Sequence, residues 1–134
     1  MDVNSAFANP EVEKEGAWVR YRDGSKIKIA RIGNANYTRS YDAKFKAHRR
    51  KQRAGTLETE VEQRLLCEVV AKTILLDWQG FTQNGKEFKY TEKRAMDLLE
   101  SNIDFRNEVV ELAVEEENFH SELLQESEKN LPGS

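Results

Sequence analysis

The chain has 134 residues, of which 34% are charged and 38% are hydrophobic, and its net charge is −3. A length of about 100 to 150 residues is typical of one domain with its own core. Cys67 is the only cysteine, which excludes an internal disulfide, and its place in an apolar run predicts a small buried side chain. The sequence has no signal-peptide pattern and no run of about 18 apolar residues, so we expect a cytoplasmic protein without a membrane partner.

The two parts of the chain carry opposite charge. Residues 1–55 hold 13 Lys and Arg against 6 Asp and Glu, a net charge of +7, whereas residues 56–134 hold 8 against 18, a net charge of −10. This polarity suits nucleic-acid contact at the basic end, and it equally suits association of unlike patches between identical subunits.

The first regular element predicted is a β-hairpin. Residues 1–15 hold few apolar side chains, and we expect them to form a flexible N-terminal segment. Two runs rich in β-branched and aromatic residues, 18–22 and 26–32, flank Asp23-Gly24, a dipeptide that accepts the positive φ angles of a tight turn. An isolated hairpin is marginal in water, so its apolar face is expected to pack on helices.

Two helices are predicted next along the chain. The first is a basic helix that is expected to end at about Arg53. A spacing of four residues places three aromatic rings on one of its faces, those of Tyr37, Tyr41 and Phe45. Thr56 is the expected N-cap of the following helix. That helix is expected to stop at Trp78. It carries two adjacent apolar lines, and the width of this stripe predicts a central core helix.

The second half of the chain is predicted to contain a turn and two further helices. Asn84-Gly85 between Phe81 and Phe88 predicts a tight turn. Thr91 is expected to cap a short helix. Asp104 is expected to cap a long acidic helix that ends at about residue 127.

The predicted fold class is α+β: a mainly α-helical single domain of about four helices with an N-terminal β-hairpin. The domain is expected to span residues 16–128, and residues 129–134 are expected to form a flexible C-terminal tail, because proline and glycine in this tail cannot continue a helix.

No residues have the spacing of a catalytic or metal site. His48 and His120 are far apart in the chain, and neither a His and Cys metal motif nor a glycine-rich phosphate loop occurs. We therefore predict no enzyme activity, no cofactor and no metal.

Two surfaces are candidates for binding a partner. One is a run of basic side chains within residues 44–53, of which the candidates are Lys46, Arg49, Arg50, Lys51 and Arg53. This run could neutralise phosphates, but no recognition helix or RNA-binding sheet accompanies it, which favours an acidic protein surface such as another copy of the chain. The other is the distal part of the terminal helix, with Phe119, Leu123 and Leu124.

Short motifs follow one another in a defined order over residues 69–119. They are an aliphatic helix that closes on Asp77-Trp78-Gln79-Gly80, the turn Asn84-Gly85-Lys86, Tyr90-Thr91, Leu98-Leu99, Asp104-Phe105-Arg106 and Asn118-Phe119. The ordered set resembles tail assembly chaperones of long-tailed, siphovirus-type bacteriophages, and the similarity covers about residues 16–130.

The resemblance implies a protein of the host cytoplasm that binds and solubilises the phage tape measure protein. It also implies that the protein assists tail tube assembly, self-associates and is absent from the mature virion. Two other functions remain as alternatives: a small nucleic-acid-binding protein that uses the basic helix 44–53, and a structural tail adaptor.

The resemblance further implies a second, longer product. Such chaperones are often made in two lengths, because some ribosomes slip back one base near the end of the shorter reading frame. Glu128-Lys129-Asn130 can be encoded as GAA-AAA-AAC, which contains the slippery run A-AAA-AAC. We therefore expect a longer form that shares residues 1 to about 130 and recruits the tail tube protein.

Overall fold

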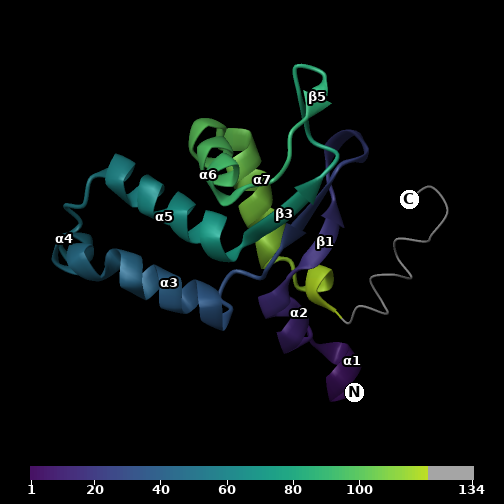
Figure 1. Ribbon diagram of the computed structural model, residues 1–134. Coiled ribbons are helices and arrows are strands. Elements are labelled where there is room, and N and C mark those ends of the chain that lie inside the picture. The colour runs from purple at the N-terminus through teal and green to yellow at the C-terminus, as the bar shows by residue number, and fades with distance from the viewer. Residues whose placement is uncertain (121–134) are drawn as a thin grey trace.

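The computed structural model describes residues 1–120 and is built around a three-stranded antiparallel sheet with helices packed against it (Figure 1). The strands of this sheet are β1 (Ala17–Arg20), β2 (Lys26–Ile29) and β3 (Leu75–Gln79), in the order β1-β2-β3. A separate small hairpin consists of β4 (Thr82–Gln83) and β5 (Lys86–Glu87). The predicted α+β class, mainly helical with an N-terminal hairpin, is confirmed.

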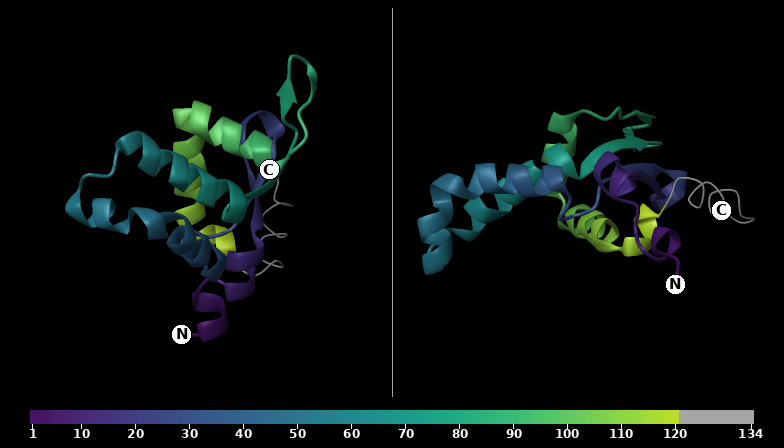
Figure 2. Two further views of the ribbon diagram at one scale, coloured as in Figure 1. Left: turned by 60° about the vertical axis from the view of Figure 1, so that its left-hand side comes forward. Right: turned by 90° about the horizontal axis from the view of Figure 1, so that it is seen from below.

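Helices supply most of the described chain. They are α1 (Val3–Ala6), α2 (Pro10–Glu15), α3 (Ala35–Phe45), α4 (Arg49–Ala54), α5 (Thr59–Thr73), α6 (Glu92–Ser101) and α7 (Ile103–Val114). Short 3-10 turns are η1 (Arg22–Gly24), η2 (Lys46–His48) and η3 (Glu116–Phe119). We call residues 35–73 the arm: α3 and α5 lie side by side, and α4 lies at the end that is remote from the sheet (Figures 1 and 2).

Both turns predicted from dipeptides are present. β1 and β2 pair antiparallel, with Ala17 opposite Ile29. Asp23 and Gly24 between them have φ angles of 55° and 78°. Asn84 and Gly85 between β4 and β5 have φ angles of 54° and 79°. The positive φ angles that these dipeptides accept are therefore used at both turns.

The predicted basic helix is divided into α3 and α4 by η2. The expected aromatic face is present on α3, where the Tyr41 and Phe45 rings stack with centroids 4.3 Å apart. The chain then turns, and Gln52 of α4 donates a hydrogen bond from Nε2 to the Tyr41 hydroxyl at 2.9 Å. This contact connects α4 to α3. Gly55 in a left-handed conformation ends α4 after Ala54, close to the expected end at Arg53.

The prediction that the central helix continues to Trp78 is wrong, and so is Thr56 as its cap. α5 begins after Glu58, ends at Thr73 and is followed by β3, in which Trp78 lies opposite Ile27 of β2. Each outer edge of a two-stranded hairpin has backbone N–H and C=O groups without partners. β3 pairs with these groups along the free edge of β2. The Trp78 indole also donates to the Phe88 carbonyl oxygen at 2.7 Å, which fixes the end of β3.

The predicted long C-terminal helix ends early. α7 is capped by Asn102, not by Asp104, and ends at Val114. The Asn118 side chain then donates to the Leu112 carbonyl oxygen at 2.9 Å, and Phe119 turns into the core with no exposed surface. The remaining predicted helix and the predicted tail 129–134 lie outside the described residues.

Residues 10–15, which belong to the N-terminal segment that was expected to be flexible, form α2. Asn9 caps this helix, and Pro10 occupies its first turn, where a missing N–H costs nothing. Val12 is 6% exposed in the core, and Glu13 pairs with Arg31 at 2.9 Å. The Asn9 amide also donates to the Phe119 carbonyl oxygen at 2.8 Å, so the two ends of the described chain meet.

Hydrogen bonds connect the first hairpin to α7. Glu108 accepts hydrogen bonds from the Tyr21 hydroxyl at 3.0 Å and from Arg22 Nη2 at 2.6 Å. The hydrogen bond from Arg22 lowers the pKa of Glu108 below its ordinary 4.5. Burial, followed by the hydrogen bond with Glu108, raises the pKa of Tyr21 to about 12.

We predict that this contact makes the stability depend on pH at both extremes. The folded state holds the pKa of Glu108 below 4.5, so its contribution is present at neutral pH and is lost as the pH falls through the folded pKa. The folded state raises the pKa of Tyr21 from 10.0 to about 12, so that contribution is lost as the pH rises between these values. Urea unfolding at a series of pH values measures both effects.

Glu108→Gln should flatten the acid limb of this dependence, whereas Glu111→Gln, an exposed neighbour on α7, should leave it unchanged. If the free energy of unfolding falls equally at acid pH in Glu108→Gln and in the unchanged protein, the contact does not contribute to stability.

We also predict that Phe119→Ala lowers the free energy of unfolding by about 3–5 kcal/mol, the usual cost of emptying a buried phenylalanine site. Val114→Ala is the control, because Val114 is 53% exposed and its loss should change the free energy by less than about 0.5 kcal/mol. Chemical denaturation of both variants gives the comparison, and equal small losses would contradict the core position of Phe119.

Candidate functional site

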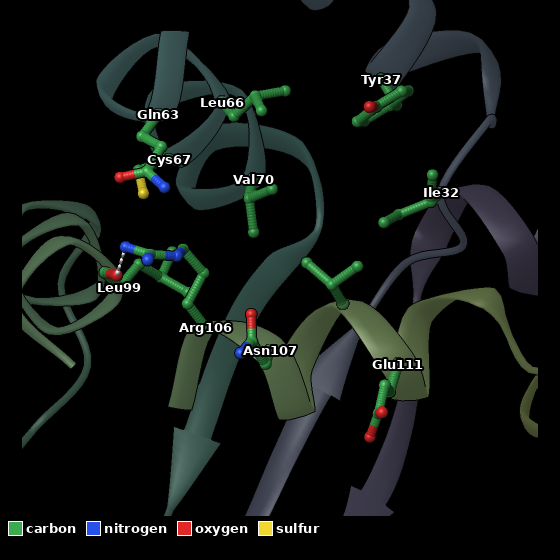
Figure 3. Close-up of a pocket in the computed structure, with 11 residues that line it drawn as sticks. Ile32, Tyr37, Gln63, Leu66, Cys67, Val70, Leu99, Arg106, Asn107 and Glu111 are labelled. Atoms are coloured by element: carbon green, nitrogen blue, oxygen red, sulfur yellow. Dashed lines mark hydrogen bonds between the residues drawn. The ribbon is translucent and has the colours of Figure 1, made fainter. Parts of the chain in front are cut away.

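An apolar cleft of about 480 Å³ lies between α5 and α7 (Figure 3). Ile32, which precedes the arm, and Tyr37 of α3 also line it. Its floor consists of Leu66, Val70 and Val110. Its rim carries both hydrogen-bond donors and acceptors: Gln63, Arg106, Asn107 and Glu111. A volume of this size is typical of a binding site that takes several side chains or a small molecule.

The helical repeat explains why apolar side chains face this cleft. α5 carries two apolar lines; Leu65 and Val69 of the first are buried in the core, whereas Leu66 of the second is only partly buried. α7 repeats this arrangement, because Val109 is fully buried and the adjacent Val110 faces the cleft. Each helix therefore uses one apolar line for folding and presents part of another at the cleft.

Arg106 and Cys67 occupy the side of the cleft next to α6. Arg106 donates from Nη1 to the Leu99 carbonyl oxygen at 3.2 Å, which holds its side chain in place (Figure 3). Cys67 is 1% exposed, which confirms the predicted buried position. Burial raises the pKa of the Cys67 thiol, and the contact with Arg106 offsets only part of this rise. The thiol is thus protonated at neutral pH, which does not suit a nucleophile.

The basic run forms an exposed cluster at the end of the arm, which we call the basic tip: Lys46, Arg49, Arg50, Lys51 and Arg53. Among the described residues only Arg49 of this set has an ion-pair partner, Asp42 at 3.6 Å. None of the five lines the apolar cleft. The two surfaces are therefore separate along the arm.

The second predicted binding surface is not supported at Phe119. Its side chain is fully buried and packs in the core, so it is not available to a partner in this structure. The helix ends before it because Glu115 adopts an extended conformation, and the chain folds back toward α2. Leu123 and Leu124 lie outside the described residues.

The cleft was missed by the sequence prediction. Its signal was present in the second apolar line of α5, but that line was assigned to the core together with the first.

In residues 1–120 no group of three or more His, Cys, Asp and Glu could hold a metal ion. No helix in the same part of the chain is both long enough and apolar enough to cross a membrane.

One family model matches this chain, and the match covers residues 32–130. The matched region contains the arm, both helices α6 and α7, and every residue that lines the apolar cleft. No curated protein and no solved structure matches. Because the match spans most of the sequence, the chain belongs to the YdaY prophage protein family.

Proposed function

We propose that this prophage protein is a tail assembly chaperone and that it binds the phage tape measure protein in the apolar cleft. The observation that carries the proposal is the partly exposed apolar surface that Leu66 and Val110 form between α5 and α7, next to the buried Val70. The membership in a prophage family and the ordered motifs over residues 69–119 agree with such a function.

The chemistry of the cleft suits one face of an amphipathic helix. Such a helix inserts apolar side chains from successive turns into a groove and leaves its polar flanks at the edges. The floor here is aliphatic, and the rim residues Gln63, Arg106 and Glu111 offer donors and acceptors to polar flanks. A tape measure protein is a long helix with apolar stripes that aggregate when bare, so a chaperone must cover such stripes reversibly.

The remaining parts of the proposal follow from this function. The protein performs no chemical reaction, acts in the host cytoplasm and leaves before the virion is complete. A longer form, made by slippage at Glu128-Lys129-Asn130, recruits the tail tube protein. A structural tail adaptor would instead stay in the mature particle, which mass spectrometry of purified virions distinguishes.

We predict that Leu66→Ser combined with Val110→Ser weakens tape measure binding by at least about tenfold, since two partly exposed apolar contacts of roughly 1 kcal/mol each are lost. The matched control is Ile103→Ser, which removes an apolar side chain that is 63% exposed on α7 but outside the cleft. Co-purification and binding titration with the tape measure protein from the same prophage give the measurement.

Thermal unfolding of each variant separates binding from folding. The proposal expects a loss of binding in the double variant while its cooperative unfolding is retained. Equal binding by the double variant and Ile103→Ser would reject the cleft as the binding site.

The basic tip favours a second element of the proposal, self-association through unlike charges. Residues 35–55 hold seven Lys and Arg and one Asp, whereas Glu115, Glu116 and Glu117 form an exposed acidic corner beyond α7. Attraction between exposed groups is screened beyond about 8 Å at physiological ionic strength and beyond roughly 3 Å at molar salt. The association is therefore expected to be sensitive to salt.

We predict that Arg50→Glu with Lys51→Glu reduces the sedimentation coefficient at low salt to the value that the unchanged protein has at molar salt. Lys86→Glu with Lys89→Glu makes the same charge change at exposed positions outside the arm and should leave association intact. The nucleic-acid alternative would be favoured if the unchanged protein retains DNA and Arg50→Glu with Lys51→Glu loses it, while both have the same oligomeric state.

A further inference from the structure

A second cavity, of about 440 Å³, lies among α2, α3, the end of α5 and β3. We call it the cationic pocket. It shares no residue with the apolar cleft and faces a different side of α3. The side chains that give it its character are Lys14, Arg39, Lys72 and Ser40.

Three cationic side chains reach this pocket from three separate elements. Lys14 belongs to α2, Arg39 to α3 and Lys72 to α5. No Asp or Glu lines the pocket, and within residues 1–120 none of the three cations has an ion-pair partner. Like charges gathered around one cavity repel one another unless an anion lies between them.

Ser40 supplies an independent indication of a ligand. Its hydroxyl oxygen is the one buried side-chain polar atom in the described part of the chain that has no hydrogen-bond partner. A serine within a helix usually donates to a carbonyl of the preceding turn, and a buried polar atom without a partner is rare in folded proteins. Thr73, the neighbouring hydroxyl, differs because it donates to the Val69 carbonyl oxygen at 2.8 Å.

We propose that the cationic pocket binds a phosphate group, carried by inorganic phosphate or by a nucleotide. A phosphate dianion offers oxygens in several directions, which suits donors that approach from α2, α3 and α5. A carboxylate offers one charge and two oxygens in one plane, which leaves part of this donor set unused. Asn36, which also lines the pocket, accepts a hydrogen bond from Arg39 Nη1 at 3.5 Å. This inference is independent of the tape measure proposal.

Isothermal titration calorimetry of the full chain with inorganic phosphate and, separately, with ATP tests the proposal. We expect saturable binding at one site, weakened by about tenfold in Lys72→Gln and in Ser40→Ala, since each variant removes a donor to a charged group. Lys86→Gln is the control, because it removes one positive charge from an exposed position on β5, outside both the basic tip and the pocket. Circular dichroism confirms that each variant is folded.

Binding of both ligands would show that the phosphate group is sufficient, and binding of ATP alone would assign the group to a nucleotide; either result supports the proposal. Two results overturn it: no saturable binding of either ligand, or an equal loss in Lys86→Gln and Lys72→Gln. Tighter binding of a glutamate-rich peptide, lost in Lys72→Gln, would assign the pocket to an acidic protein and would overturn it as well.

Discussion

Burial of the wide apolar side of α5 is the constraint on which the rest of the structure depends. The helix contacts α3, α6 and β3, and Val69 at its centre has no exposed surface. Each fully buried side chain of this type contributes about 1.5–3 kcal/mol to the hydrophobic part of folding. No single neighbour covers two apolar lines, so α3 packs on one side and α6 on the other. The cleft is the part of this apolar surface that neither neighbour covers.

The signals that predicted the fold correctly are local. Asp23-Gly24 and Asn84-Gly85 predict turns because their backbones accept positive φ angles, and both do so in the structure. Thr91 was correctly predicted to cap α6, and its hydroxyl accepts a hydrogen bond from the Arg94 amide at 3.0 Å. In each case, interactions among residues close in the chain are sufficient to form the turn or the helix cap.

The errors concern segments whose conformation is decided by distant partners. Leu75–Gln79 reads as the continuation of an apolar helix, but β2, nearly fifty residues earlier, offers it an unpaired strand edge. Phe119 matches a helical stripe, yet its backbone carbonyl accepts a hydrogen bond from Asn9 and its ring enters the core. The cleft was missed for the same reason: periodicity identifies an apolar line on α5 but not the neighbour that covers it.

The proposed chaperone function depends on what fills the apolar cleft. Site-specific photocrosslinking in cells that produce the protein together with its tape measure protein is the most direct measurement. With a photoreactive residue at position 66, in the floor of the cleft, we expect a covalent adduct to the tape measure protein. With the same photoreactive residue at position 103, exposed on α7 outside the cleft, we expect no adduct. Equal adducts from both positions, or an adduct from position 103 alone, would contradict the proposed function.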